Sequence, residues 1–191
     1  MKVLITCAVW ERAQIFEIMA AGLQRMRSLM DTLGVDSQVL FIVDERDEQN
    51  TLLIDQMATA DANILHVVIS NDMPLGERMN RAMDAAIGLD WDYMMQMGSD
   101  DLITDAGILG LMSYAFNGCP FFGFRQLYFV DSVTTRMKQM LTSNTFGAGR
   151  MVSREIYEKT GVFCDANQRS GLDNYMQESL YSACGVIPSV G

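Results

Sequence analysis

Short apolar runs alternate with longer segments of helical periodicity along the first hundred residues. The apolar runs cover 2–9, 38–43, 64–69 and the stretch that begins at Tyr93. Helices fit the segments at 49–60 and about 74–87, and an apolar helix face is formed by Ile15, Phe16, Met19, Leu23, Met26 and Met30. Buried strands that alternate with amphipathic helices predict an α/β fold with a mainly parallel sheet covered on both faces.

The second half of the chain has a less regular pattern. The spacing predicts helices at about 104–116 and 153–160, an aromatic strand pair across 120–137, and a last helix that begins near Asp173. No internal repeat or low-complexity linker separates the two halves. A single domain over 1–191 is therefore expected.

The composition is that of a globular protein. Of the 191 residues, 49% are apolar and 20% are charged, and the formal net charge is −10. This acidity argues against a general nucleic-acid binder, because a polyanionic ligand would have to be held locally by a metal ion or a few arginines. The apolar N-terminal run is too short for a signal peptide, and no segment reaches membrane-spanning length. We expect a soluble cytoplasmic protein, in the host cytoplasm if its source is viral.

The cysteines and the one histidine do not form a metal-binding pattern. The cysteines are scattered without a CxxC pair, at Cys7, Cys119, Cys164 and Cys184. His66 lies among apolar residues of the third predicted strand, which favours a core position over a ligand role. Free thiols in a reducing compartment are therefore expected.

Two of the predicted strands end in adjacent carboxylates. Asp100 and Asp101 follow the fourth strand, and Asp44 and Glu45 follow the second. Ligands of open α/β sheets bind outside the carboxyl ends of the strands, so these acids are expected to line a site. Neighbouring carboxylates repel each other unless a cation lies beside them, and a divalent metal ion with a phosphorylated ligand meets this need. For Asp100 and Asp101 the alternative is a helix cap followed by a solvated acid. For Asp44 and Glu45 the alternative is a solvated loop.

Four short motifs, taken in order, resemble those of a known enzyme family. The first strand runs into a segment from Thr6 to Arg12, and the second strand ends in Asp44-Glu45. The segment 74–80 is similar to a Gly-x-x-x-x-Asn helix start, and Gly98-Ser99-Asp100-Asp101 is similar to a variant of an Asp-x-Asp metal motif. This order resembles the family-2-like glycosyltransferases with the GT-A fold, over nearly the full length of the chain. The family's order of acceptor-side elements is also followed further along the chain, at 147–154, 161–163 and Leu172-Asp173.

The resemblance implies a single-domain GT-A fold with a nucleotide-sugar-binding half, 1–101, and an acceptor-side half, 102–191. It implies a hexosyltransferase that moves a sugar from a nucleotide-diphosphate sugar, in particular a UDP-sugar, to an acceptor hydroxyl. The implied donor contacts are Thr6, Asp44, Glu45, Arg78, Asn80 and Ser99. Asp100 and Asp101 would hold Mg²⁺ or Mn²⁺, and Asp173 would be the general base of an inverting displacement.

The chain departs from the family pattern at three places. Gly98 stands where the family often has the first aspartate of its metal motif, so Asp100 is the expected ligand and Asp101 its alternate or a helix cap. Leu172 replaces the first acid of a Glu-Asp pair and leaves Asp173 alone. A metal-binding histidine near the C-terminus is missing, since His66 is the single histidine.

Other interpretations of these residues stay open. Asp173 also fits a helix N-cap, Arg78 an exposed helix residue, and Trp10 either stacking on a ligand or packing beside the first strand. A non-catalytic nucleotide-binding or acidic-pocket regulatory domain, such as a receiver, also places carboxylates at strand ends. A receiver is shorter and needs a lysine at a late strand end. A sugar nucleotidyltransferase needs a Gly-rich loop after the first strand, where this chain has Cys7-Ala8-Val9-Trp10.

The acceptor is left open between saccharides and hydroxymethylated pyrimidines in viral DNA. Cationic side chains of the second half are candidates for phosphate contacts, namely Arg125, Arg136, Lys138, Arg150 and Arg154. The net charge of −10 opposes binding to DNA. The sequence therefore predicts a donor site in more detail than an acceptor site.

Overall fold

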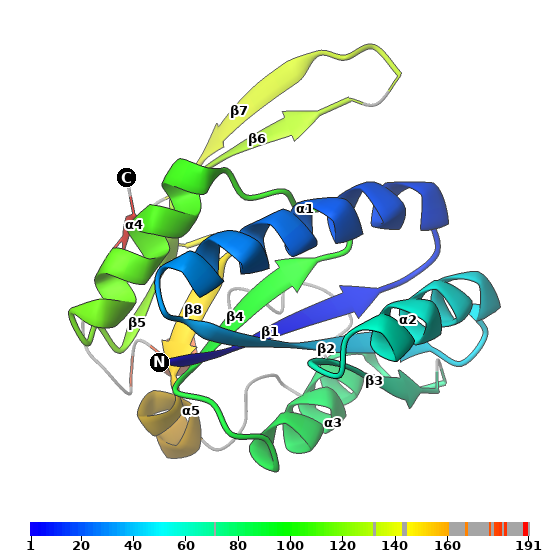
Figure 1. Ribbon diagram of the computed structural model, residues 1–191, viewed down its shortest axis with the longest axis horizontal. Coiled ribbons are helices and arrows are strands. Elements are labelled where there is room, and N and C mark those ends of the chain that lie inside the picture. The colour runs from blue at the N-terminus through cyan, green and yellow to red at the C-terminus, as the bar shows by residue number, and fades with distance from the viewer. Residues whose placement is uncertain are drawn as a thin grey trace.

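The four apolar runs of the first half form neighbouring parallel strands in a computed structural model of the chain. The structure describes residues 1–70, 72–131, 133–142, 145–160, 167, 176, 178–180, 182 and 189–190. The four strands are β1 (Lys2–Val9), β2 (Asp36–Asp44), β3 (Ile64–Ile69) and β4 (Tyr93–Gly98). Their order in the sheet is β3-β2-β1-β4, and all three pairings are parallel (Figure 1).

Three strands of the second half extend this sheet beyond β4. The full order is β3-β2-β1-β4-β8-β5-β9, with β5 (Phe121–Phe124), β8 (Arg150–Ser153) and β9 (Ser189–Val190). Strand β8 runs antiparallel to both β4 and β5, while β9 is parallel to β5. The predicted α/β fold with a mainly parallel, mixed central sheet is confirmed.

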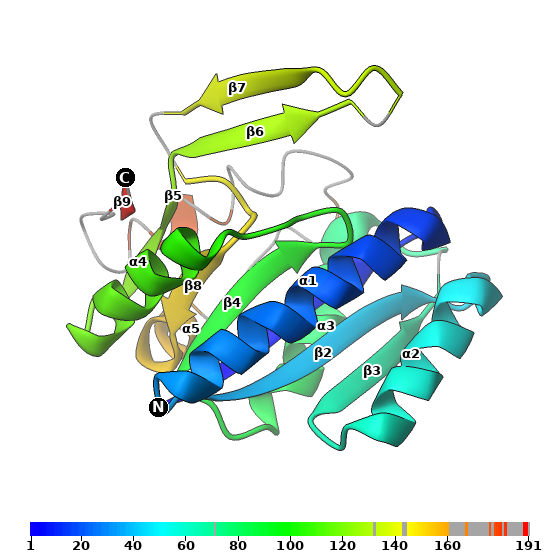
Figure 2. The ribbon, with the colours of Figure 1, turned by 45° about the horizontal axis from the view of Figure 1, so that its top comes forward.

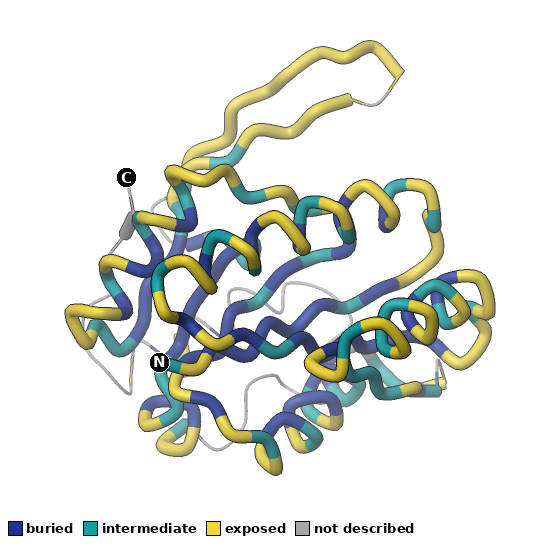
Figure 3. Tube along the Cα trace, in the orientation of Figure 1, coloured by how far each residue is buried: buried dark blue, intermediate teal, exposed yellow. Residues whose placement is uncertain are grey.

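Helices cover both faces of the sheet, as the alternation of apolar runs predicts. On one face, α1 (Ala13–Thr32), α2 (Glu48–Ala60) and α4 (Asp105–Phe116) pack on the sheet through a core that includes Phe16, Ile54 and Ile108 (Figure 1). On the other face, α3 (Leu75–Ile87) and α5 (Arg154–Thr160) enclose a second core. Buried residues follow the strands and the inner sides of the helices (Figure 3).

The chain reverses its direction of travel across the sheet beside β1. The first two crossovers add β2 and then β3 on one side of β1, whereas α3 leads back to β4 on the other side. In doubly wound folds a crevice opens at such a switch, outside the carboxyl ends of the strands. Ala8 of β1 lies opposite Gly98 of β4 in this register. The predicted acid pair therefore emerges at the switch point.

Helix ends follow local chemistry where the sequence supplies it. Gly34, with φ of 72°, lies two residues beyond α1 and takes the left-handed conformation that ends many helices. Asp47 caps α2 by accepting from the amide of Asn50, and Thr104 caps α4 by accepting from the amide of Gly107. The alternative in which Asp101 caps the following helix is therefore wrong.

A two-stranded hairpin, β6 (Gln126–Val130) and β7 (Met137–Leu141), projects from the body (Figure 2). The predicted strand pair over 120–137 thus divides between β5, in the main sheet, and this hairpin. Paired residues share a face, so Leu127, Phe129 and Lys138 lie on one side and Tyr128, Val130 and Met137 on the other. Nearly every residue of the hairpin is exposed (Figure 3).

Some predicted features lie outside the described residues. These are Asp173, Leu172, the segment 161–163, Cys164 and Cys184. The other two cysteines are free thiols, buried at Cys7 and partly buried at Cys119. Among the described residues, no helix is long and apolar enough to cross a membrane.

Candidate active site

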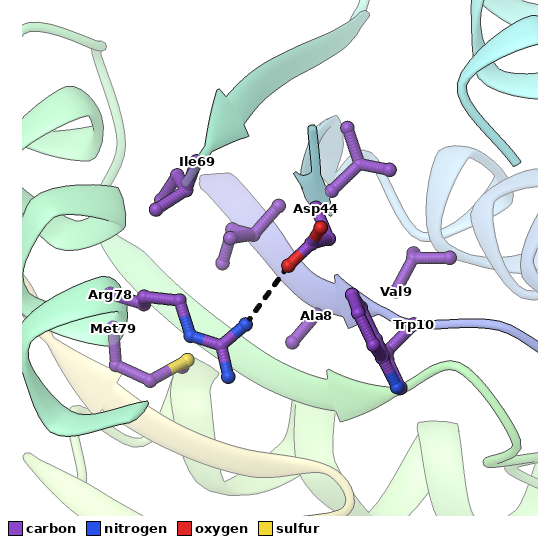
Figure 4. A pocket seen from close by; sticks show the side chains of 9 residues that line it. Ala8, Val9, Trp10, Asp44, Ile69, Arg78 and Met79 are labelled. Atoms are coloured by element: carbon purple, nitrogen blue, oxygen red, sulfur yellow. Dashed lines mark hydrogen bonds and ion pairs between the residues drawn. The ribbon is translucent and has the colours of Figure 1, made fainter. Parts of the chain in front are cut away.

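Two adjoining cavities open at the carboxyl ends of the central strands. The first has a volume of about 400 Å³ and is lined by Ala8, Val9, Trp10, Ile42, Val43, Asp44, Ile69, Arg78 and Met79 (Figure 4). The second has a volume of about 310 Å³ and extends over β4 to Gly98 and Asp101. Ala8, Ile42 and Met79 line both cavities, so the two form one groove across the switch point.

A buried ion pair forms the polar side of the first cavity. The Asp44 side chain is only 1% exposed, and its carboxylate accepts from Nη1 of Arg78 at 3.3 Å (Figure 4). The same carboxylate accepts from the backbone amide of Arg46 at 3.0 Å and from Nε of Arg46 at 3.4 Å. Nε of Arg78 is buried without a hydrogen-bond partner among the described residues. The cavity therefore offers a carboxylate and an unsatisfied donor to a polar ligand.

Trp10 forms an outer wall of the same cavity. Its ring lies 5.8 Å from the Arg46 guanidinium carbon, and the residue is 39% exposed. The ring lines the cavity and is not buried in the core, so stacking on a ligand stays a prediction for Trp10. A flat ring at the mouth of a cleft is suited to stack on a base or a sugar.

The remaining predicted donor contacts lie at different distances from the groove. Thr6 lines the second cavity, and its hydroxyl donates to the carbonyl of Met95 at 3.4 Å. Glu45 is exposed, accepts from the Ser70 hydroxyl at 2.7 Å and lines neither cavity. Ser99 is buried just beyond Gly98, and Asn80 follows the lining residue Met79. The structure thus brings Thr6, Asp44 and Arg78 to the groove and leaves Glu45 at its outside.

The two acids after β4 both lie close to Gly98. Oδ2 of Asp101 accepts from the Gly98 amide at 2.5 Å. A Cβ atom at Gly98 would stand 3.0 Å from this oxygen and 3.2 Å from Oδ1 of Asp100. The absent side chain therefore leaves the space in which the two carboxylates converge. An aspartate at this position would displace both.

The converging oxygens are a donor set that suits a hard divalent cation. Mg²⁺ is commonly held by one or two carboxylates together with phosphate oxygens and water. Among the described residues, no group of three His, Cys, Asp or Glu side chains could hold a metal ion without such a ligand. His66 takes no part, because it lies half-buried on β3 with Nε2 at 3.5 Å from Asp55. The residues therefore fit a metal ion that arrives with a phosphorylated ligand.

The charges of Asp100 and Asp101 affect a titratable group in the neighbouring strand β1. Burial, followed by the charges of Asp101 and Asp100, raises the pKa of the Cys7 thiol well above its ordinary value. A thiol in this state is protonated at neutral pH and is a poor nucleophile. Cys7 is thus a structural residue of β1.

Arg12, which ends the first motif segment but had no assigned role, binds the first of the two acids. Nη1 of Arg12 donates to Oδ2 of Asp100 at 2.8 Å. Arg12 and its neighbour Glu11 have φ values of 52° and 51°, in the left-handed region that side chains other than glycine seldom adopt. Each such residue costs about 1–3 kcal/mol, whereas an exposed ion pair contributes about 1 kcal/mol at most. The ion pair alone cannot offset the strain of this turn.

Two of the cationic residues considered for acceptor binding have structural roles instead. Arg150 is only 2% exposed, and its guanidinium donates to the carbonyl of Thr145 at 2.8 Å. Arg154 donates to the carbonyls of Ile87 and Leu89 at the end of α3. Both guanidinium groups are thus engaged by the protein itself, and Arg150 is too deeply buried to contact a phosphate. Arg125, Arg136 and Lys138 are exposed on the hairpin or at its base.

The hairpin supplies a further wall that sequence periodicity did not identify. Leu127 and Phe129 of β6 line the second cavity, together with Phe146, Gly147 and Ala148. Residues of the second half therefore face Thr6 and Asp101 of the first half across the groove. The alternation along β6 predicts a strand, but it does not indicate which side faces a ligand.

Comparison with known structures identifies the fold. TarS from S. aureus aligns with a TM-score of 0.70 at 12% sequence identity over 100% of this chain. The mannosyltransferase PcManGT from Pyrobaculum calidifontis, solved with GDP-Man and Mn²⁺, aligns with a TM-score of 0.65 at 11% identity over 98% of this chain. The chain therefore has a GT-A glycosyltransferase-like fold, as its motifs predicted.

The similarity does not extend to sequence or to full length. No family model and no curated protein sequence matches the chain. The chain spans 35% of TarS and 54% of the mannosyltransferase. A 4-diphosphocytidyl-2C-methyl-D-erythritol synthase aligns with a TM-score of 0.58 at 10% identity over 98% of this chain, and this chain covers 86% of that enzyme.

Proposed function

We propose that this chain is a glycosyltransferase that takes its sugar from a nucleotide-diphosphate donor. The observation that carries the proposal is the groove at the switch point, where two carboxylates converge at one end and a buried ion pair lies at the other. The GT-A fold supports it, because the mannosyltransferase that shares the fold was solved with GDP-Man and Mn²⁺.

The donor would lie along the groove with its nucleoside in the first cavity. The Asp44 carboxylate could accept from the N3–H group of a uracil, and Trp10 could stack on the base. Thr6, Glu45, Arg78, Asn80 and Ser99 complete the proposed set of donor contacts. A UDP-sugar is the proposed donor, and residues 1–101 are the proposed donor half.

The diphosphate would then reach Asp100 and Asp101. These two carboxylates are the proposed ligands of Mg²⁺ or Mn²⁺, which would neutralise charge on the departing diphosphate. In the chain itself, Asp101 is held by the Gly98 amide, and this contact orients its carboxylate toward the second cavity. The sugar would lie in the second cavity, between Thr6 and the β6 wall.

The proposed general base is Asp173, which lies outside the described residues. It would accept the proton of the acceptor hydroxyl as that oxygen attacks the anomeric carbon and the diphosphate leaves. One displacement without an enzyme nucleophile inverts the anomeric configuration. Residues 102–191 are accordingly the proposed acceptor half.

The proposed acceptor is a saccharide or a hydroxymethylated pyrimidine in DNA. The three exposed cations at Arg125, Arg136 and Lys138 favour the second. The burial of Arg150 and the structural role of Arg154 reduce the number of phosphate contacts that DNA could make. Transfer to DNA should fall steeply as salt rises, whereas transfer to a neutral saccharide should not.

A nucleotidyltransferase is the second candidate, because this chain covers 86% of the 4-diphosphocytidyl-2C-methyl-D-erythritol synthase against 54% of the mannosyltransferase. Such an enzyme would release diphosphate from a nucleoside triphosphate and a sugar phosphate. The end of β1 and the residue after it, from Cys7 to Trp10, contain no glycine that could cradle a triphosphate. A diphosphate-release assay with nucleoside triphosphates separates the two candidates.

The test of the glycosyltransferase proposal is a hydrolysis screen of nucleotide sugars with Mg²⁺ or Mn²⁺. We expect activity in the unaltered chain and a loss of about 100-fold or more in Asp100→Ala and in Asp173→Ala. The matched control is Asp105→Ala, because Asp105 is similarly exposed and also pairs with an arginine, Arg25, at 2.7 Å. Binding of a nucleoside diphosphate without hydrolysis would instead indicate a non-catalytic binding domain.

A further inference from the structure

The strained turn between β1 and α1 is held from outside by the start of α2. The backbone amide of Glu11 donates to Oδ2 of Asp47 at 2.7 Å. Nδ2 of Asn50, a residue with no exposed surface, donates to the carbonyl of Glu11 at 2.8 Å and to Oδ2 of Asp47 at 2.7 Å. Glu11, the first of the two left-handed residues, is thus fixed by a buried amide and a helix-capping carboxylate.

This arrangement fixes the start of the Arg12 side chain at the rim of the groove. Arg12 is two residues beyond Trp10, which lines the first cavity, and it bonds Asp100, which is adjacent to the second-cavity residue Asp101. Its guanidinium therefore lies beside the acid pair, although neither Arg12 nor Asp100 lines either cavity. Strained backbone that neighbouring structure holds in place is characteristic of functional sites.

The guanidinium has more donors than its bond to Asp100 uses. An arginine carries five N–H groups. Among the described residues, one of them is engaged, in the bond from Nη1 to Asp100. The Arg12 and Asp100 side chains are 52% and 47% exposed, so the remaining donors are accessible to an anion. Guanidinium groups bind phosphate oxygens through paired hydrogen bonds.

We propose that Arg12 binds the diphosphate of the donor and bridges it to Asp100. This inference rests on the proposed function, since it requires a nucleoside diphosphate in the groove. Arg12 would share the neutralisation of the diphosphate with the cation at the acid pair, in a chain whose net charge of −10 opposes the binding of anions. Gly98 stands where the family motif often has an aspartate. Close to this position, Arg12 supplies a positive charge beside Asp100.

The test is calorimetric titration of the full chain with UDP, GDP and CDP, and with the matching nucleosides, with and without Mn²⁺. We expect Arg12→Gly to lower the affinity for the preferred nucleoside diphosphate by about 10- to 100-fold and to leave the affinity for its nucleoside unchanged. Thermal stability should not fall, because glycine adopts positive φ without strain. Arg12→Lys should bind with intermediate affinity, since it keeps the charge and loses the planar fork.

Two controls isolate the guanidinium. Glu11→Gly relieves the same kind of strain one residue earlier, and Arg25→Ala removes an exposed arginine that is also paired with an aspartate. Both should bind nucleoside diphosphate within about threefold of the unaltered chain. Equal binding by Arg12→Gly, or an equal loss for the nucleoside, would overturn the inference. A failure of the unaltered chain to bind any of the three diphosphates would instead overturn the proposed function.

Discussion

Replacing Gly98 with alanine tests whether the two acids after β4 converge on one cation site. The added methyl group would stand 3.0 Å from Oδ2 of Asp101 and 3.2 Å from Oδ1 of Asp100, closer than ordinary contact. Both atoms are ends of flexible side chains, so the strand is expected to persist while the carboxylates move apart. The backbone of Gly98 is not in the left-handed region, which means that alanine is conformationally allowed.

The stability change follows from two opposing effects. Replacing a strand glycine with alanine contributes about 0.5–1 kcal/mol of stability through the unfolded chain. Movement of Asp101 weakens its 2.5 Å bond to the Gly98 amide, and a hydrogen bond to a charged group contributes about 1.5–3 kcal/mol. We expect a net loss of about 1 kcal/mol, which for a chain of this size lowers Tm by roughly 2–4 °C.

The same substitution should affect the binding of Mn²⁺ together with a nucleoside diphosphate more strongly than it affects the stability of the fold. Misplaced ligand-shell groups typically reduce metal affinity by about 10- to 100-fold. Calorimetric titration and thermal unfolding of Gly98→Ala measure both quantities. Gly88→Ala is the matched control, because a Cβ atom at Gly88 meets nothing within 4 Å. If Gly98→Ala binds Mn²⁺ and the nucleotide as the unaltered chain does, the carboxylates do not form the proposed site.

Three further predictions concern the nucleoside cavity and two buried titratable groups. Asp44→Asn removes the buried charge opposite Arg78 and should weaken the binding of nucleoside and nucleoside diphosphate alike by about tenfold in calorimetry; an effect on the diphosphate alone would contradict the placement of the nucleoside. Because burial and the nearby acids raise the pKa of Cys7, iodoacetamide at pH 8 should modify Cys119 in the native chain and Cys7 only after denaturation, as peptide mass spectrometry would show. Burial raises the pKa of Tyr157 from 10.0 to about 12, so its contribution to stability is complete below pH 10 and is lost as the pH rises toward 12. Tyr157→Phe should therefore lose less stability than the unaltered chain across that interval in denaturant titrations, and parallel losses would refute this.

The first half of the fold follows closely from the sequence, because β1, β2 and β4 are largely buried on both faces. The runs 2–9 and 64–69 coincide with β1 and β3, and helical spacing from Ile15 to Met30 identifies the buried face of α1. The second half departs from this rule. The hairpin exposes Val130 and Leu141, so apolar pattern no longer reports burial there. Strand order is also not encoded locally, since β8 inserts between β4 and β5 through long-range pairing.

The residues of the candidate site likewise divide into those that the sequence predicts and those that it does not. Asp44 and the acids after β4 could be predicted because parallel strands bring their carboxyl ends to one edge. The left-handed turn at Arg12 could not be predicted, since neither Glu11 nor Arg12 is a residue type that favours positive φ. The structural roles of Arg150 and Arg154 could not be predicted either, because charge alone does not distinguish a surface arginine from one that binds backbone carbonyls.

The hairpin of β6 and β7 belongs to the part of the fold that the sequence predicts poorly, and it also forms part of the candidate site. Its inner face lines the second cavity with Leu127 and Phe129, while its other contacts with the body are few because most of its side chains are exposed. An isolated two-stranded hairpin is marginally stable in water. This wall of the second cavity is therefore among the least stable parts of the described chain, whereas the first cavity is built on the buried strands β1 and β2. On the proposed function, the nucleoside would be bound by rigid structure, whereas the donor sugar and the acceptor would meet an element whose displacement costs little.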